Sequence, residues 1–180
     1  MKSEKKDRLV WMDLEMTGLV SEVDKILEIA TVITDPNLNI IGIGPELAIF
    51  QKDEILENMN DWCKQHHGES GLIDKVRCSK VSEKEAEKLT LDFLKEHVNP
   101  EEAPLCGNSI HQDRNFITRY MPFLGNYLHY RNIDVSTIKE LSFRWFPDLP
   151  MFKKASKHTA LEDILESIEE LKYYREKIFC

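Results

Sequence analysis

The stretch that decides the fold is LVWMDLE, residues 9–15. Successive side chains of a strand point to opposite faces, so Asp13 and Glu15 would share one face, while the other face would be apolar. This pattern is typical of a mostly buried strand. Two more apolar runs follow, over residues 26–34 and 40–50, with turn residues between them. We therefore expect an antiparallel meander of three strands.

Beyond residue 50 the period of the apolar residues changes from two to 3.6, which indicates helices alternating with short strands. The order of these elements predicts an α/β fold, with a mixed β-sheet flanked by α-helices in one domain over residues 1–180. The expected elements are a helix around residues 55–62, a helix opening at Ser82, a strand at 103–106, a helix at 113–120, a strand at 130–135, a helix with a capping box from Thr137 to Glu140, and a last helix over 161–171.

The composition limits the kind of substrate. The 180 residues include 24 Lys and Arg against 32 Asp and Glu, a net charge of −8, with 42% hydrophobic residues. Such a chain can bury a core and fold as one globular domain. An acidic balance disfavours binding along long phosphate backbones, because that mode needs many Lys and Arg contacts. A short or end-bound anionic substrate remains compatible with this charge.

The cellular compartment can be inferred from three features of the sequence. The apolar runs are shorter than the roughly 20 residues that a membrane-spanning helix needs. The polar start lacks the apolar region and cleavage site of a secretory signal. The four cysteines are irregularly spaced, which favours reduced thiols. We expect a cytoplasmic protein without a membrane partner.

Asp13 and Glu15 are the first candidate functional residues. Two residues apart on a strand, they lie roughly 6.7 Å apart along the chain at about 3.3 Å per residue. Two carboxylates on an otherwise apolar strand repel each other and lose water, so a cation between them is expected. The alternative is that the strand ends in solvent, where acids need no partner.

A third acid, Asp113, follows the turn Gly107-Asn108-Ser109. In α/β sheets, the carboxyl end of a strand usually presents the ligand-binding side. Considered alone, Asp113 is better explained as an ordinary acid at a helix start, where the helix dipole stabilises it, and it gains weight only together with the other acids.

The segment around His158 and Asp163 supplies the last candidates. Thr159 and Glu162 have the spacing of a capping box. If Thr159 is the N-cap, His158 and Asp163 occupy the two positions whose side chains meet in a helix staple, which is normally apolar. A surface histidine paired with an acid at a helix end is the plainer alternative.

Together these residues predict a catalytic metal site. Our hypothesis is that Asp13, Glu15, Asp113 and Asp163 bind two divalent cations, a pair that suits attack on a phosphodiester. Carboxylate oxygens favour Mg²⁺ or Mn²⁺ over zinc. His158 suits a general base, because the unperturbed pKa of histidine lies near 6.5.

These motifs resemble the three exonuclease motifs of the DEDDh family, of ribonuclease H-like fold, and the surrounding sequence is similar to its oligoribonuclease branch. The similarity extends over nearly the whole chain. The segments that carry it are VWMDLEMTGL at 10–19, LCGNSI at 105–110, YRNIDVST at 130–137 and EELKYYR at 169–175. Thr159 departs from the pattern, since a larger residue is expected after the histidine.

The resemblance implies a homodimeric 3′-to-5′ exoribonuclease that hydrolyses very short RNAs, chiefly dinucleotides, to 5′-mononucleotides. By the same resemblance, Leu19 and Trp62 would flank the bases. The site around the 5′ end of the substrate would be closed by Ser109 and His66 and by Tyr130, Arg131, Ser136 and Thr137 of the partner subunit. From its spacing alone, Trp62 would instead be a core residue on the same helix stripe as Ile55 and Met59.

Three alternatives remain open from the sequence. One is a DEDDh exonuclease that trims or proofreads longer single strands. Another is a non-catalytic binding module on the same fold, which would have no use for four converging carboxylates. The third is a zinc site formed by Cys63, His66, His67 and Cys78, whose ligand types zinc accepts although their spacing is irregular.

Overall fold

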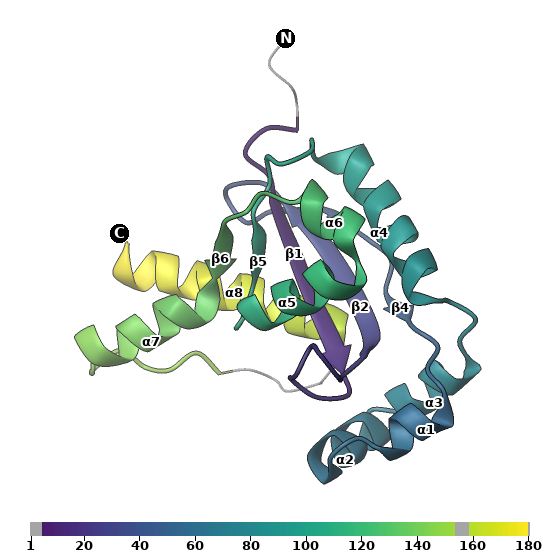
Figure 1. The fold of residues 1–180 in the computed structure, drawn as a ribbon. Helices are drawn as coiled ribbons and strands as arrows, with labels where there is room; N and C mark the ends of the chain where they lie inside the picture. Colours follow the sequence, from purple (N-terminus) through teal and green to yellow (C-terminus); the bar gives the residue numbers. More distant parts are fainter. Residues whose placement is uncertain (1–4, 154–158, 180) are drawn as a thin grey trace.

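The computed structural model describes residues 5–153 and 159–179. In this part of the chain one mixed sheet has the strand order β3-β2-β1-β5-β6, and a further short strand, β4, pairs with β2 (Figure 1). The first four strands pair antiparallel, whereas β5 and β6 extend the sheet in parallel. The strands are β1 (Leu9–Met16), β2 (Ile26–Thr34), β3 (Ile40–Ile43), β4 (Leu47–Ala48), β5 (Leu105–Gly107) and β6 (Asn132–Asp134). The expected mixed sheet is confirmed.

The third run of the meander is not one strand, as we expected for residues 40–50, but two. The chain breaks at Gly44, whose N–H donates to the carbonyl of Thr31 at 2.8 Å, and at Pro45, which has no N–H for a ladder. A side chain at position 44 would also meet Phe93, since an added Cβ would lie 2.7 Å from that ring. β4 therefore resumes the pairing with β2 on a new register.

Helices cover both faces of the sheet. Apolar residues on one face of β1, such as Met12, pack with α4, α5 and α6, while Trp11 on the other face packs with α7 and α8. β2 is buried along its whole length between these layers. Figure 1 shows α5 in front of the sheet and α8 behind it. The helices are α1 (Asp53–Glu57), α2 (Asp61–Glu69), α3 (Leu72–Cys78), α4 (Glu83–His97), α5 (His111–Tyr120), α6 (Pro122–Tyr127), α7 (Val135–Trp145) and α8 (Ala160–Ile178).

Three helices at one end of the sheet differ from the single helix expected around residues 55–62. Asn60 ends that expected helix, because its side chain accepts from the N–H of Cys63 and caps α2 instead. This turn moves Trp62 out of the stripe of Ile55 and Met59. α3, which the apolar pattern did not indicate, begins after Gly71 in the left-handed conformation. α6 was not expected either, and it begins at a proline, which suits the first helical position.

The helix caps were predicted correctly in two cases and wrongly in one. Ser82 caps α4 and Thr159 caps α8, each accepting from a backbone N–H three residues on. α7 is capped by Asp134, whose side chain accepts from the N–H of Ser136, so the capping box expected at Thr137 is wrong. None of the helices in the described residues is long and apolar enough to cross a membrane.

We expect Asp134→Ala to lower the free energy of unfolding by about 1 kcal/mol, because the N-cap bond of α7 is lost. Thr137→Ala is the matched control one turn further on and should cost less than about 0.5 kcal/mol. Urea unfolding measures both. Equal losses would contradict the assignment of Asp134 as the cap.

Candidate active site

Three carboxylates meet where α8 crosses β1. Asp13 and Glu15 project from the face of β1 that packs on α8, and Asp163 lies in the first turns of that helix. One ligand oxygen from each acid lies within 4.8 Å of the others, and all three residues are half-buried. Residues that are 150 positions apart in the chain thus share one small volume.

Burial and mutual repulsion make this cluster unfavourable when its acids are ionised. The pKa of Glu15 is raised to about 8, first by burial and then by the charges of Asp163, Glu28 and Asp113. A cation held by the three oxygens would remove this cost, and hard divalent ions prefer such oxygen ligands. The donor set therefore fits divalent metal binding.

Asp113 reaches the cluster from the opposite layer. It is 5% exposed in the first turn of α5, and its Oδ1 accepts from the N–H of Leu14 in β1 at 2.9 Å. Burial raises the pKa of this carboxyl, although the Leu14 N–H opposes the effect. Its charge acts on Glu15, but it is not in the group whose ligand atoms lie within 4.8 Å of one another.

His158 lies outside the described residues, so its position remains a prediction. The helix start beside it is described. Thr159 accepts from the N–H of Glu162 as the N-cap, and the N–H of Asp163 donates to the carbonyl of Thr159 at 2.9 Å. The prediction that the side chains of His158 and Asp163 meet requires Thr159 to be the N-cap, and Thr159 has that role.

Glu28 is a buried acid that we did not single out from the sequence. It lies directly opposite Glu15 in the pairing of β1 with β2, and its side chain is 3% exposed. Its Oε2 accepts from the N–H of Ala160 at 3.4 Å, and its Oε1 lies 3.9 Å from Nζ of Lys75. Burial raises its pKa. The sequence could have indicated Glu28, because a carboxylate inside the apolar strand ILEIATVIT needs polar partners when it is buried.

A cavity of about 630 Å³ adjoins the acids. Glu15 belongs to its wall, and Leu19 and Trp62 line it as well. Both apolar side chains are 65% exposed, so Trp62 is not a core residue. Trp62 stacks on His66 with ring centroids 4.4 Å apart. The remaining lining residues are Leu14, Met16, Gly18, Asn60, Cys63 and His67.

The zinc alternative gains no support from the described residues. His67 directs Nε2 at the carbonyl of Met16, 2.9 Å away. Cys63 is buried in a small apolar cluster with Met59, whereas Cys78 is exposed. Within residues 5–153 and 159–179, the group of side chains able to share a metal ion is the acidic one.

The hydroxyl residues expected at the 5′ end of the substrate lie around the turn after β5. The N–H of Ser109 donates to Oγ of Ser136 at 2.6 Å and to Oδ1 of Asp134 at 2.9 Å. Asn108 ties the same turn to α8, donating to Oγ of Ser167 and Oε2 of Glu170. In this chain Ser136 therefore lies beside its own Ser109.

Tyr130, Arg131 and Thr137 are exposed, the first two before β6 and the third after it. Tyr130 projects from the turn before β6 with 76% of its surface exposed, and the guanidinium of Arg131 lies 5.2 Å from its ring centre. Thr137 is exposed in the first turn of α7. None of these three is in the wall of the cavity beside Glu15.

Comparison with known proteins decides the family. The RNase_T family model, described as an exonuclease, matches residues 10–171. The oligoribonuclease of Shewanella loihica is 59% identical over 172 residues, covering 95% of both chains. This chain belongs to the oligoribonuclease family. An oligoribonuclease of Haemophilus influenzae is 57% identical over 172 residues, covering 95% of this chain and 94% of the relative.

Solved structures confirm the ribonuclease H-like fold expected for an oligoribonuclease. Exonuclease I from Methylocaldum szegediense aligns with a TM-score of 0.74 at 17% identity, covering 95% of this chain and 41% of that one. E. coli exonuclease I in complex with a dA16 oligonucleotide aligns with a TM-score of 0.75 at 14% identity, covering 96% and 42%. The chain thus spans about two fifths of these structures.

We expect the metal-free protein to lose stability as the pH rises from 5 to 8, in part because of Glu15. An unfolded Glu15 ionises above about 4.5, whereas the folded one keeps its proton up to about 8. Glu15→Gln removes this difference. Between pH 5 and 8, the free energy of unfolding should therefore fall less in Glu15→Gln than in the wild type. The two falls should differ by at least about 1 kcal/mol, which is smaller than the roughly 1.36 kcal/mol that corresponds to a shift of one pKa unit.

Chemical unfolding in a chelator at both pH values measures this difference. Glu69→Gln, at an exposed position of α2, is the control and should follow the wild type. Added Mn²⁺ should stabilise the wild type more than Glu15→Gln, since a ligand stabilises only the state that binds it. Parallel stability curves for Glu15→Gln and the wild type would contradict the burial argument.

Proposed function

We propose that this protein is a 3′-to-5′ exoribonuclease that hydrolyses very short RNAs, chiefly dinucleotides, to 5′-mononucleotides. Membership of the oligoribonuclease family supports the exoribonuclease activity. One observation carries the assignment to this site, namely that three clustered carboxylates adjoin a cavity lined by exposed apolar side chains. We take residues 1–180 to act as one catalytic domain.

In this proposal Asp13, Glu15, Asp113 and Asp163 hold two divalent ions, Mg²⁺ or Mn²⁺. Bound there, the ions would activate water and stabilise the charge on the leaving oxygen. The all-carboxylate donor set and the raised pKa of Glu15 support this choice. The hydrogen bond from Leu14 fixes Asp113 on the same strand that carries the first two acids.

His158 would act as the general base. Its ring nitrogen would take a proton from the attacking water, whose oxygen bonds to phosphorus while the bond to the 3′-oxygen of the preceding nucleotide breaks. The released 3′-oxygen gains a proton, and the products are a 5′-mononucleotide and the shortened RNA. The cap at Thr159 supports this role, because it sets where the helix bearing Asp163 begins.

Leu19 and Trp62 would hold the bases of the substrate. An indole offers a flat face on which any base can stack, which suits an enzyme without sequence preference. His66 already backs the Trp62 ring at 4.4 Å and so fixes its orientation. With a net charge of −8, the protein must hold its substrate by a few local contacts, which favours short RNA.

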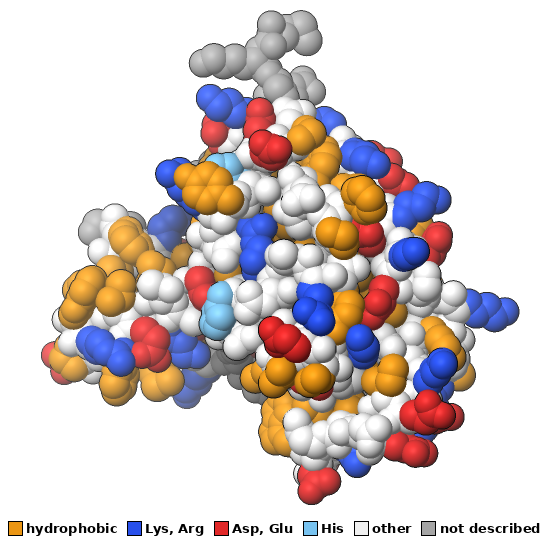
Figure 2. Space-filling view, in the orientation of Figure 1, with side chains coloured by type: hydrophobic (Ala, Val, Ile, Leu, Met, Phe, Trp, Pro, Cys, Tyr) orange, Lys and Arg blue, Asp and Glu red, His pale blue; other side chains and the backbone are white. Residues whose placement is uncertain are grey.

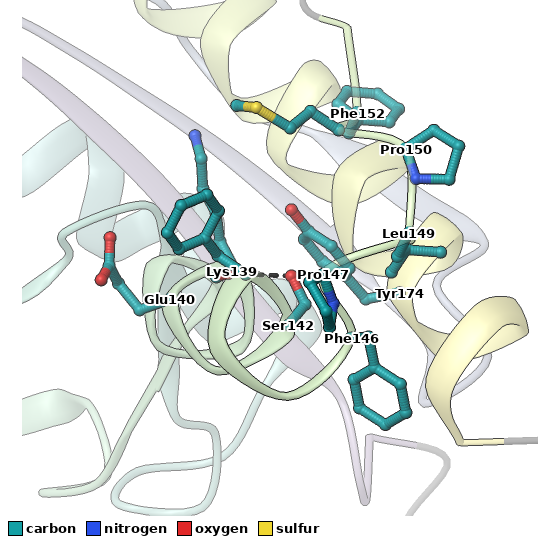
Figure 3. Close-up of a pocket in the computed structure, with 11 residues that line it drawn as sticks. Lys139, Glu140, Ser142, Phe146, Pro147, Leu149, Pro150, Phe152 and Tyr174 are labelled. Carbon is teal, nitrogen blue, oxygen red and sulfur yellow. Dashed lines mark hydrogen bonds between the residues drawn. The ribbon is translucent and has the colours of Figure 1, made fainter.

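We further propose that the enzyme acts as a homodimer in the cytoplasm, with Tyr130, Arg131, Ser136 and Thr137 of the partner subunit completing each site. Exposed apolar side chains support a protein contact. Figure 2 shows hydrophobic side chains gathered over α7, where Phe143 and Trp145 are exposed. Beside them lies a cavity of about 390 Å³ between α7 and α8, lined by Phe146, Leu149, Phe152 and Tyr174 (Figure 3).

The test of substrate length compares a dinucleotide with an RNA of ten residues under Mn²⁺. We expect kcat/KM for the dinucleotide to be at least about tenfold higher, a difference of about 1.4 kcal/mol. Chromatography of the released mononucleotides measures both rates. Equal or faster cleavage of the longer RNA would favour the trimming or proofreading exonuclease, and binding without release would favour a non-catalytic module.

Asp163→Asn tests whether the described cluster is the site. Its kcat on both RNAs should fall about a thousandfold, equivalent to about 4 kcal/mol, because one metal-binding carboxylate is lost. Asp74→Asn, at an exposed acid of α3, should retain the wild-type rate. Full activity in Asp163→Asn would place the chemistry elsewhere.

Complementation tests the dimer. At a dinucleotide concentration well below KM, Asp113→Ala should be inactive, because it lacks an acid. Tyr130→Ala should lose most of the wild-type rate at that concentration, because it lacks the partner's tyrosine and binds the substrate weakly. A purified mixed dimer should recover about half of the wild-type rate, since one of its two sites combines intact acids with an intact partner arm. No recovery would show that Tyr130 acts within its own subunit.

A further inference from the structure

Arg114 follows Asp113 in α5 but is directed elsewhere, since successive helical side chains are turned about 100° apart. Its half-buried guanidinium donates to three acceptors in residues 129–132, which we call the arm. Nη2 donates to the carbonyl of His129 at 2.8 Å and to that of Arg131 at 3.3 Å. Nε and Nη2 both donate to Oδ1 of Asn132, at 3.1 and 2.8 Å.

These bonds hold the arm by two backbone carbonyls and the side chain of Asn132, and they leave the side chains of Tyr130 and Arg131 exposed. The ring of Tyr130 stacks on that of His129 with centroids 4.4 Å apart, and the guanidinium of Arg131 lies 5.2 Å from the centre of the Tyr130 ring. The N–H of Arg131 donates to Nδ1 of His129 at 3.1 Å. An exposed aromatic face beside a guanidinium is a combination that binds a nucleotide, by stacking and by phosphate contact.

The contact suits an arginine. The donors of a planar guanidinium are spread over three nitrogens in a fixed fork that reaches two carbonyls and a side-chain amide, whereas the donors of a lysine all sit on one nitrogen. Without the fork, the partly buried carbonyl of His129 would have to find another donor, and the arm would lose these four hydrogen bonds to α5. The same helix that presents Asp113 to β1 therefore also presents the arm to the outside.

We propose that Arg114 is a positioning residue for substrate binding, which holds the arm so that Tyr130 and Arg131 meet the RNA in the site of the partner subunit. The inference rests on the proposed function, because that proposal assigns Tyr130 and Arg131 to the substrate. Arg114 acts through the arm and itself contacts no substrate.

Arg114→Lys separates the charge from the fork. We expect KM for a dinucleotide to rise about tenfold, or about 1.4 kcal/mol, while kcat at saturation stays within about threefold of the wild type. Arg119→Lys, at an exposed position of the same helix, is the control and should change neither constant. An unchanged KM, or a loss confined to kcat, would overturn the proposal.

A double-mutant cycle identifies the route of the effect. If Arg114 acts through the arm, Arg114→Lys should add less than about twofold to the KM of Tyr130→Ala, since interacting residues are not additive. Losses that multiply would show that Arg114 acts independently of Tyr130 and would overturn the proposal.

Asn132→Ala approaches the same contact from the other side and covers the case in which Arg114→Lys does not fold. It removes the side-chain acceptor and should raise KM about threefold, the effect of one modest hydrogen bond. A folded Asn132→Ala with wild-type KM would overturn the proposal. A wild type that prefers ten-residue RNA would instead refute the proposed function, so the two failures are distinguishable.

Discussion

The repulsion among carboxylates at the crossing of β1 and α8 is the constraint on which the rest of the structure depends. Three acids share a half-buried volume, and two more, Glu28 and Asp113, add their charges to it. Without cations, protonation of Glu15 relieves part of this repulsion, and a well-packed surrounding fold keeps the acids close together. The fully buried β2 and the packed face of α8 supply that packing.

The two helical layers of the fold supply different residues of the candidate site. The α8 side of the sheet supplies Asp163, whereas the α5 side supplies Asp113 and, through Arg114, the exposed arm. Asp134 caps α7 and also accepts from the turn at Ser109, so one carboxylate sets the start of a helix and the shape of a loop. The side chain of Asp134 thus fixes both the start of α7 and the turn at Ser109.

How much could be predicted from the sequence depended on whether the deciding interaction was local. Asp13 and Glu15 share a face because a strand alternates, and Thr159 caps α8 because its partner lies three residues away. The cap of α7 was missed because Thr137 and Glu140 offered an equally good local pattern, and Asp134 is favoured by a distant contact with Ser109 as well as by its local bond to Ser136. The exposed position of Trp62 likewise depends on a turn at Asn60 that the apolar period does not show.

β5 has only three residues and pairs with β1 at Val10 and Trp11 alone. Among the residues that the structure describes, no strand pairs with the second half of β1 on that side, and the amide of Leu14 donates to Asp113. A buried carboxylate of the candidate site occupies the gap where a longer β5 would have completed the sheet. An insertion that extended β5 as far as Leu14 would pair with that amide and displace the carboxyl of Asp113, so the short length of β5 leaves room for a residue of the candidate site.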